Sequence, residues 1–253
     1  MSETAARRQE ITVRQLTQNA EFVEAVKIQK TIWGFEDIDL LPVRLFVVAS
    51  KVGGHVFGAY DGDKMVAFCL AIPGLKAGRK YYLHSHMLGV LDGYRDLGLG
   101  RRLKLAQRDE AMTRDIDLIE WTFDPLELKN AFFNIERLGA VIRRFVFNQY
   151  GTTSSSLHAG LPTDRCIPEW YINSSRVRNL LAGQPEPRPE IVARIDVPSN
   201  IGDLKRSDPA RAREIQKSVS EQFDCYLSQG LAVVAFDRGE TTGSYLFAPW
   251  ENK

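Results

Sequence analysis

Arg95-Asp96-Leu97-Gly98-Leu99-Gly100 lies between an apolar run, residues 81–90, and a pattern of helical spacing that continues to residue 114. The run predicts a strand and the pattern predicts a helix beginning near Gly98. The first amide groups of a helix lack internal partners and carry partial positive charge, so they can bind a phosphate group. Glycines keep side chains away from such a ligand. The stretch therefore predicts a turn that binds a pyrophosphate.

Two common nucleotide-binding motifs do not fit this turn. A dinucleotide fold expects G-x-G-x-x-G, and Leu103 occupies the third glycine position. A P-loop expects G-x-x-x-x-G-K-[ST], and the sequence contains no Gly-Lys-Ser or Gly-Lys-Thr. ATP is therefore disfavoured as the ligand.

The segments around the turn alternate in the way that mixed α/β domains do. Periodicity predicts, before the turn, a strand, two helices and three strands: residues 11–16, 19–33, 43–51, 55–60, 65–72 and 81–90. After the helix it predicts a strand, a helix ending at Gly139 and a second strand: residues 117–123, 128–138 and 141–147.

The rest of the chain predicts an irregular segment and an added module. Residues 148–167 lack periodicity and lead into a short strand at 169–172, and residues 183–190, with three prolines, predict a linker. A β-α-β-β extension follows, with Asp208 as cap and Pro209 as the first residue of its helix. We expect a main domain over 1–182 and an extension over 183–253 that packs on it.

Composition restricts the classes of partner. The net charge is +1, which gives no global field toward nucleic acid or an anionic membrane. The N-terminus lacks an apolar signal core and no stretch is long enough for a membrane helix, so we expect a cytoplasmic protein without nucleic-acid or membrane partners. Cys69, Cys166 and Cys225 have no metal-ligand spacing and predict isolated thiols, with Cys166 as a less favoured nucleophile.

The turn resembles the coenzyme A motif of the GNAT (GCN5-related N-acetyltransferase) superfamily, V-x-x-x-x-[RQ]-x-x-G-x-[GA], with Val90, Arg95, Gly98 and Gly100 in its positions. The likeness covers about residues 11–172, and residues 84–139 most resemble an uncharacterised subgroup of predicted acetyltransferases. It implies an α/β (α+β) fold with a mixed, mostly antiparallel sheet flanked by helices. It also implies acetyl-CoA or another acyl-CoA as co-substrate and no metal. The cofactor-binding residues that it implies are Leu88, Gly89, Val90, Arg95, Asp96, Leu97, Gly98, Leu99, Gly100, Arg101 and Asn130.

Acyl transfer to an amine needs a proton acceptor, and three residues are candidates. His84 and His86 are two positions apart on the strand before the turn, so they should project from one face, and imidazole titrates near neutrality. The pattern resembles the strand of arylalkylamine acetyltransferases, in which a histidine pair is implicated in passing on the amine proton. Glu120, on the next strand, is the rival base. The alternative is that both imidazoles only hydrogen-bond within the sheet.

The general acid expected from the resemblance is missing. A family-typical tyrosine would lie four residues before Gly139, where this chain has Ile135, and Tyr150 or Tyr94 could substitute from a loop. A thiolate needs little help in leaving, so the alternative is a reaction without a general acid.

The substrate and the assembly state are less defined. Asp164 and Arg165, in the irregular segment, are candidate substrate contacts, with an ordinary turn as the alternative. Arg143 and Arg144 predict an exposed strand pair. The acceptor would be an amine of a small molecule or a peptide, and a homodimer is compatible with the sequence. The alternatives to an enzyme are a non-catalytic acyl-CoA sensor and an interaction protein with the same fold.

Overall fold

The computed structural model describes residues 10–151, 160–184 and 186–250. These form two compact units, one with the residues up to Ile119 and the other with the residues from Glu120 onward. Strand β5 (Leu118–Glu120) lies at the division between them. Each unit is described in turn.

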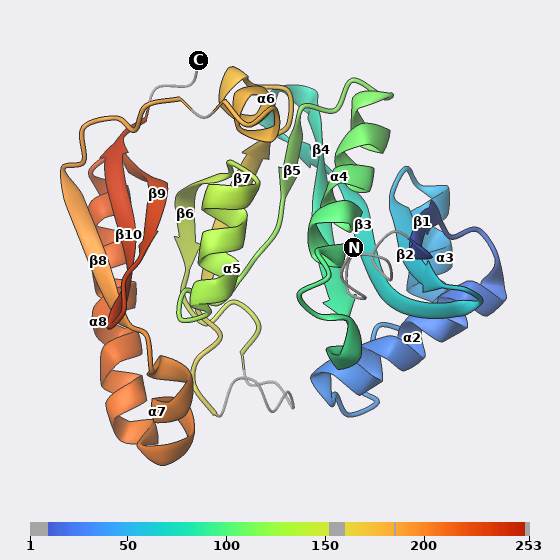
Figure 1. The fold of residues 1–253 in the computed structure, drawn as a ribbon, viewed down its shortest axis with the longest axis horizontal. Helices are drawn as coiled ribbons and strands as arrows, with labels where there is room; N and C mark the ends of the chain where they lie inside the picture. Colours follow the sequence, from blue (N-terminus) through green and yellow to red (C-terminus); the bar gives the residue numbers. More distant parts are fainter. Residues whose placement is uncertain (1–9, 152–159, 185, 251–253) are drawn as a thin grey trace. The chain divides into compact units, whose positions relative to one another are not determined.

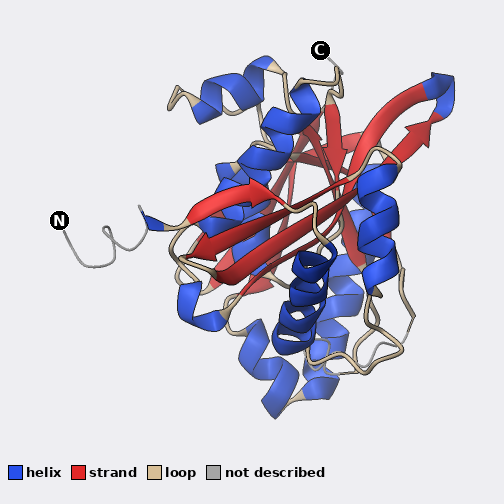
Figure 2. Ribbon diagram, turned by 90° about the vertical axis from the view of Figure 1, so that its right-hand side faces the viewer, coloured by secondary structure: helices blue, strands red, loops and turns tan. Residues whose placement is uncertain are grey.

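The first unit contains an antiparallel sheet with helices on both faces (Figures 1 and 2). Its strands pair in the order β1-β2-β3-β4. The elements are β1 (Thr12–Gln15), α2 (Asn19–Trp33), α3 (Val43–Lys51), β2 (His55–Asp61), β3 (Lys64–Lys76), β4 (Lys80–Val90) and α4 (Leu99–Met112). The predicted order of strands and helices is confirmed for this unit, and the bounds of α2 and α3 match the prediction.

Helix ends in this unit follow local chemistry. Glu21 accepts from the amide of Gln18 at 2.9 Å, and Gly34, with φ of 60°, ends α2 in the left-handed region. Apolar side chains of α2 and α3 pack on one face of the sheet, where they form a core with Phe68 and Leu70. Leu99 and Leu103 of α4 pack in a different core with Phe57 and Cys69. The sheet therefore presents opposite faces to the first two helices and to α4.

The second unit has five antiparallel strands in the order β7-β6-β9-β10-β8. Its elements are α5 (Leu128–Phe132), β6 (Val141–Val146), β7 (Arg165–Tyr171), α6 (Ser175–Leu181), β8 (Ala193–Pro198), α7 (Ile201–Ser207), α8 (Pro209–Ser228), β9 (Leu231–Arg238) and β10 (Thr242–Pro249). Helix α5 continues into a wider π-helical turn, Phe133–Arg137, and Gly139 follows with φ of 78°.

Some predicted elements need correction. Helices α6 and α7 were not predicted, because each is only seven residues long and shows too little periodicity. Strand β7 begins at Arg165, inside the segment expected to be irregular. Strand β5 is shorter than predicted, and Phe123 instead forms an isolated bridge with Cys166. The expected cap of α8 is confirmed, since Asp208 accepts from the amide of Arg211 at 3.0 Å.

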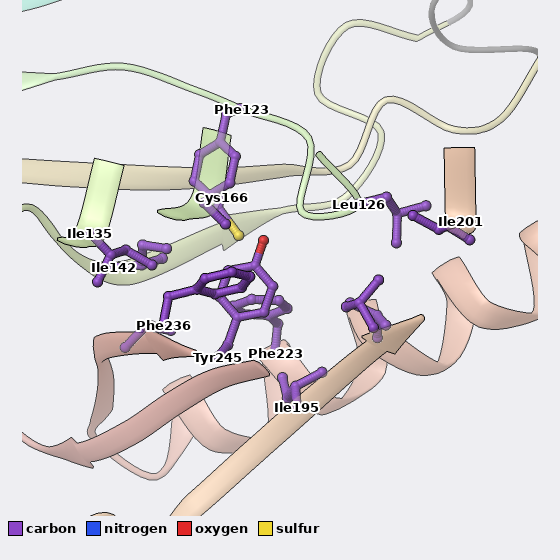
Figure 3. Close-up of a cluster of buried hydrophobic side chains, with 14 of the residues drawn as sticks. Phe123, Leu126, Ile135, Ile142, Cys166, Ile195, Ile201, Phe223, Phe236 and Tyr245 are labelled. Carbon is purple, nitrogen blue, oxygen red and sulfur yellow. The ribbon is translucent and has the colours of Figure 1, made fainter. Parts of the chain in front are cut away.

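The last segment of the chain shares the core of the second unit. Ile142 of β6 pairs with Val233 of β9, and the Tyr245 hydroxyl donates to the carbonyl of Pro125 at 2.6 Å. Figure 3 shows Phe223, Phe236 and Tyr245 gathered together, with the Tyr245 hydroxyl pointing toward Cys166. Residues 120–182 and the C-terminal segment thus form one compact unit, and the domain boundary at 182 stays a prediction.

Candidate active site

Helix α4 begins at a turn with two residues in the left-handed region. Asp96 has φ of 64° and Gly98 has φ of 75°, and the first helical bond runs from the amide of Arg102 to the carbonyl of Gly98 at 3.1 Å. By the helical pattern, the amides of residues 99–101 precede that bond and have no carbonyl within the helix to accept from them. Amides in this position, together with the helix dipole, attract anions at the start of a helix.

Packing explains where the predicted phosphate-binding residues lie. Leu97 and Leu99 are buried in the core beneath the turn, which fixes its position. A β-carbon added to Gly100 would lie 3.6 Å from Cδ2 of Leu88, which is an ordinary contact. The protein's own packing therefore does not require glycine at position 100, whereas a ligand approaching the backbone would benefit from it.

The basic side chains of the turn differ in their contacts. Arg95 is 57% exposed and pairs with Asp92 at 2.8 Å, so it can reorient toward an anion in solvent. Arg101 is half-buried. Arg102, also in the first turn of the helix, donates from Nη2 to the carbonyl of Ile11 at 2.6 Å and so ties α4 to the chain before β1.

Strand β4 is irregular at the histidine pair. Met87 pairs with Leu70 and Ser85 pairs with Ala71, which leaves His86 as an extra residue, a β-bulge. The ring centroids of His84 and His86 are 5.7 Å apart, so the structure brings the two candidates together. Burial lowers the pKa of His86, which favours the neutral imidazole that can accept a proton.

Gly89 has a packing reason that the sequence did not reveal. A β-carbon there would come within 2.7 Å of Ile32 Cδ1 and 2.8 Å of Trp33 Cη2. The end of α2 therefore packs directly against the backbone of β4, three residues beyond His86. Leu88 and Val90 point to the other face and pack in the core with α4.

A buried polar network under β4 was missed by the sequence analysis. Lys104 Nζ donates to Ser85 Oγ at 2.8 Å, and Ser85 Oγ donates to Gln107 Oε1 at 2.8 Å. All three residues are buried, and burial lowers the pKa of Lys104 to about 7. Sequence alone gives no sign of this burial, because a lysine in a helix usually faces water.

Glu120, Asn130, Asp164 and Arg165 belong to the second unit. Glu120 is buried and pairs with Arg144 at 2.5 Å, so part of its carboxylate is already engaged. Asn130 is exposed on α5. Asp164 accepts from the amide of Asn148 at 2.9 Å and from the Ser220 hydroxyl at 2.6 Å, contacts that hold a loop to α8.

The other candidates of this unit also have neighbours. Arg165 is buried, donates to the carbonyl of Asp164 at 2.9 Å and lies over the ring of Tyr150. Cys166 is buried in the apolar core, where burial raises the pKa of its thiol, so it lacks the setting of a nucleophile. Cys69 is buried as well, and Cys225 is exposed.

The expected position of the general acid is part of the core. Ile135 is 1% exposed among apolar side chains. The Tyr94 hydroxyl donates to Asp61 at 2.7 Å, and the Tyr150 hydroxyl lies 2.9 Å from Thr122 Oγ1. Packing therefore explains the absence of a tyrosine at position 135, since the hydroxyl of a phenol there would need a hydrogen-bond partner inside an apolar cluster.

Arg143 and Arg144 are not simply an exposed pair, as the sequence suggested. Arg143 binds the buried carboxylate of Glu169 through Nε at 2.8 Å, and Arg144 binds its other oxygen through Nε at 3.0 Å. The Tyr171 hydroxyl donates to Glu169 at 2.8 Å. Burial raises the pKa of Tyr171 to about 12, whereas the hydrogen bonds of Tyr171 and Arg143 keep the pKa of Glu169 below its usual range.

The described part of the chain contains neither a metal-binding group of side chains nor a helix that could span a membrane. Within residues 10–151, 160–184 and 186–250, no group of three or more His, Cys, Asp or Glu side chains could hold a metal ion. Over the same ranges, every helix is too short or too polar to cross a bilayer.

Comparison with solved structures identifies the fold. The ribosomal-protein-S18-alanine N-acetyltransferase from Escherichia coli is 19% identical over 65% of this chain and 96% of its own, with a TM-score of 0.51. YncA from Salmonella typhimurium, solved with its cofactor acetyl-CoA, is 14% identical over 66% of this chain and 98% of its own, with a TM-score of 0.53. Naa50 from Arabidopsis thaliana, in complex with the bisubstrate analogue CoA-Ac-MVNAL, is 15% identical over 63% of this chain and 97% of its own, with a TM-score of 0.50.

The chain has the GNAT fold. No protein-family model matches the sequence, and neither does any curated protein. The GNAT neighbours are matched over almost their whole length but cover about two thirds of this chain, so roughly a third of it lies outside the likeness. The predicted mixed, mostly antiparallel sheet flanked by helices is confirmed.

Proposed function

We propose that this chain is an acyl-CoA-dependent N-acyltransferase that moves an acetyl or related acyl group to the amine of a small molecule or peptide. The observation that carries the proposal is the start of α4, where left-handed Asp96 and Gly98 precede the amides of residues 99–101, which have no acceptor within the helix. This turn fits a diphosphate, because its helix N-terminus attracts anions and Gly100 places no side chain between ligand and backbone.

The fold of the neighbours supports the identity of the ligand. YncA was solved with acetyl-CoA and Naa50 with a CoA-based bisubstrate analogue, and both share the GNAT fold with this chain. Under the proposal, the turn binds the pyrophosphate of coenzyme A with Arg95 and Arg101, and the main chain of Leu88, Gly89 and Val90 binds the pantetheine arm. The thioester supplies the acyl group.

His86 is the residue we assign as proton acceptor. Its lowered pKa keeps the imidazole neutral at pH 7, and its ring lies beside that of His84, which can pass the proton on. Glu120 is less suited to this task, since Arg144 already binds its carboxylate. The amine attacks the thioester carbon, the C–S bond breaks, and the thiolate leaves with the electron pair. Because a thiolate is a good leaving group, the apolar side chain of Ile135 does not prevent this reaction.

A matched pair of substitutions at Gly100 tests the cofactor site. Gly100→Asp adds a negative charge in the first turn of α4, which favours the helix but repels a diphosphate. Gly100→Ala adds only a β-carbon, for which there is space beside Leu88. We expect acetyl-CoA to raise the melting temperature of the wild type and of Gly100→Ala, and to leave Gly100→Asp unchanged. Equal shifts for all three proteins would show that the anion site has been placed wrongly.

Thiol release separates an enzyme from a sensor. Incubation with acetyl-CoA and a panel of primary amines should release free coenzyme A in proportion to acylated amine, as measured with a thiol reagent and by mass spectrometry. Binding of acetyl-CoA without release, across acyl donors of different chain length, would identify a non-catalytic acyl-CoA-binding protein instead.

A further inference from the structure

Strand β4 presents two residues to α4 that regular alternation would place on opposite faces. Leu88 packs in the core with α4. Ser85 faces α4 as well, because its hydroxyl binds Lys104 and Gln107 of that helix. Residues an odd number apart in a regular strand point to opposite faces, yet Ser85 and Leu88 are three apart and share one. The bulge at His86 supplies the extra residue that makes this possible.

Both histidines of β4 lie on the face opposite to Ser85. His84 pairs with Ile72 of β3, and Ile72 packs in the core with α2 and α3. Directly paired residues share a face of a sheet, so His84 is on the face of those two helices. The centroid of the His86 ring is 5.7 Å from that of His84, which places His86 on the same side. The bulge therefore leaves a serine under α4 and an imidazole pair on the other face.

Without the bulge, β4 would present a different residue to α4. Met87 pairs with Leu70. Regular pairing would continue with His86 opposite Ala71, the place that Ser85 holds. The imidazole of His86 would then lie beneath α4, and Ser85 would face the other way. The choice between serine and histidine at this place decides where the imidazole lies.

Two polar residues of α4 favour the serine. Lys104 Nζ donates to Ser85 Oγ at 2.8 Å, and Ser85 Oγ donates to Gln107 Oε1 at 2.8 Å. One hydroxyl oxygen thus accepts from the lysine and donates to the glutamine. A nitrogen of a neutral imidazole is either a donor or an acceptor, so no single atom of a histidine could bind both partners. The pair of side chains on α4 is therefore matched to a hydroxyl.

Helix α4 is also attached to the sheet at a second point. His55 of β2 is buried, and its Nδ1 lies 2.6 Å from Glu110 Oε2 of α4. Arg114, just after the helix, binds the same oxygen at 2.6 Å and donates to the carbonyl of Gly53 at 2.6 Å. Because these contacts hold α4 without Ser85, the polar side chains of α4 select a residue of β4 rather than follow it.

The network is a poor source of stability. Lys104 and Gln107 are 3% and 0% exposed, so a cation and an amide have been removed from water. Among the described residues, Nε2 of Gln107 has no hydrogen-bond partner, which adds to the cost. The best-attested use of such buried polar groups is to fix the register of the elements that they join.

We propose that Lys104 and Gln107 are positioning residues: by binding Ser85 beneath α4, they fix the bulge that places the His86 ring beside His84. The kinetic part of this inference rests on the proposed function, in which His86 accepts the proton of the amine. The structural part, that α4 sets the register of β4, does not depend on it. All five residues belong to the first unit.

The test replaces the network with apolar side chains of similar size. The triple variant Ser85→Ala, Lys104→Met, Gln107→Leu should melt at pH 6 at or above the temperature of the wild type, because a buried charge is gone. Its NMR spectrum should show more than one set of amide signals for residues 80–86, since neither pairing is then selected, whereas the wild type should show one. A single set with Ala71 opposite residue 85, read from NOEs between the strands, would overturn the inference.

Kinetics connect the register to the reaction. With acetyl-CoA and an amine that the wild type acetylates, kcat of the triple variant should fall about ten- to hundredfold, as for a misplaced catalytic group, while KM for acetyl-CoA changes less than about threefold. Gln29→Met is the matched control, since Gln29 is a buried glutamine of α2 that binds the main chain of Leu41 at 2.9 and 3.3 Å. It should lose stability but keep kcat and a single set of signals. A wild-type kcat in the triple variant would contradict the positioning role.

A second variant keeps the result interpretable. If the triple variant does not fold, Ser85→Ala alone removes the hydroxyl that both partners bind, and it should give the same doubling of signals with a smaller loss of kcat. If no amine is acetylated and acetyl-CoA does not bind, the proposed function fails. The NMR comparison then decides the structural part by itself: doubled signals support it, and one set with the wild-type pairing refutes it.

Discussion

The ammonium of Lys104 lies 2.8 Å from the hydroxyl of Ser85, inside the first unit and out of contact with bulk water. This hydrogen bond joins α4, whose first turn is the proposed diphosphate site, to β4 at the residue before the bulged His86. Burial of a charged lysine lowers the free energy of unfolding by an amount that depends on pH, and this dependence can be measured.

Lys104→Met should change the pH dependence of stability. Lysine titrates near 10.4 in an unfolded chain, and burial lowers the pKa of Lys104 to about 7 in the fold. Between these values the unfolded chain binds the extra proton, so wild-type stability gains up to about 1.4 kcal/mol per pH unit from this group as the pH rises. Below pH 7 both states are protonated and the full cost of the buried charge is present.

Urea unfolding at pH 6 and pH 9 checks this expectation. The unfolding free energy of Lys104→Met minus that of the wild type should be about 1 to 2.5 kcal/mol larger at pH 6 than at pH 9, which means that the variant gains most in stability at the lower pH. Ser85→Ala retains the lysine and should keep the wild-type slope. A difference between Lys104→Met and the wild type that does not depend on pH would show that Lys104 keeps an ordinary pKa.

Arg95→Glu should abolish cofactor binding without harming the fold. Arg95 is 57% exposed and its partner Asp92 is 84% exposed, so reversal of the charge costs little stability. Arg44→Glu is the matched control, because Arg44 is an exposed arginine on a different helix, α3. Thermal melts with and without acetyl-CoA should show a ligand shift for the wild type and the control, and none for Arg95→Glu.

His86→Gln should remove the fall in kcat/KM that the wild type shows at low pH. Burial lowers the pKa of His86, so kcat/KM of the wild type should stay high above pH 6.5 and fall as the pH drops through the lowered pKa and the imidazole becomes protonated. The variant should lose about a hundredfold or more in rate and show no such fall. If His84→Gln gives that pattern and His86→Gln retains the limb, the roles of the two histidines are reversed.

Tyr245→Phe should weaken the second unit. The Tyr245 hydroxyl donates to the carbonyl of Pro125 at 2.6 Å in a buried setting, and its loss leaves that carbonyl without this donor. We expect a loss of about 1 to 3 kcal/mol in unfolding free energy. Tyr226→Phe is the control, since the half-buried Tyr226 ring retains its contact with Phe247 and should cost much less. Equal effects in denaturant melts would mean that the link from β10 to Pro125 contributes little.

Much of the first unit could be predicted from sequence, because its apolar spacing and the residues that end its helices indicate the same elements. The bounds of α2 and α3 follow from apolar spacing and from glycines that stop each helix. The turn between β4 and α4 was predicted for a similar reason, since a strand, a pair of glycines and a helical pattern follow one another there. Its binding of phosphate stays a prediction. The short helices α6 and α7 could not be found in this way, as seven residues give less than two full periods.

The register of the strands could not be predicted either. A bulge adds one residue to one strand and leaves no mark in the pattern of that strand alone. The histidine pair was expected on one face from regular alternation, whereas the structure brings the rings together at an irregular position of β4. Arg143 and Arg144 were read as an exposed pair because their common partner, Glu169, is 25 residues or more away in sequence.

The two bulges also bear on how this gene can tolerate change. An in-frame loss of the codon for His86 or for Arg143, the extra residue of β6 beside β7, would restore regular pairing and remove the irregularity that brings two like side chains together. Natural variants of these strands should therefore differ by exchange of residues, while insertions and deletions gather in the connecting loops.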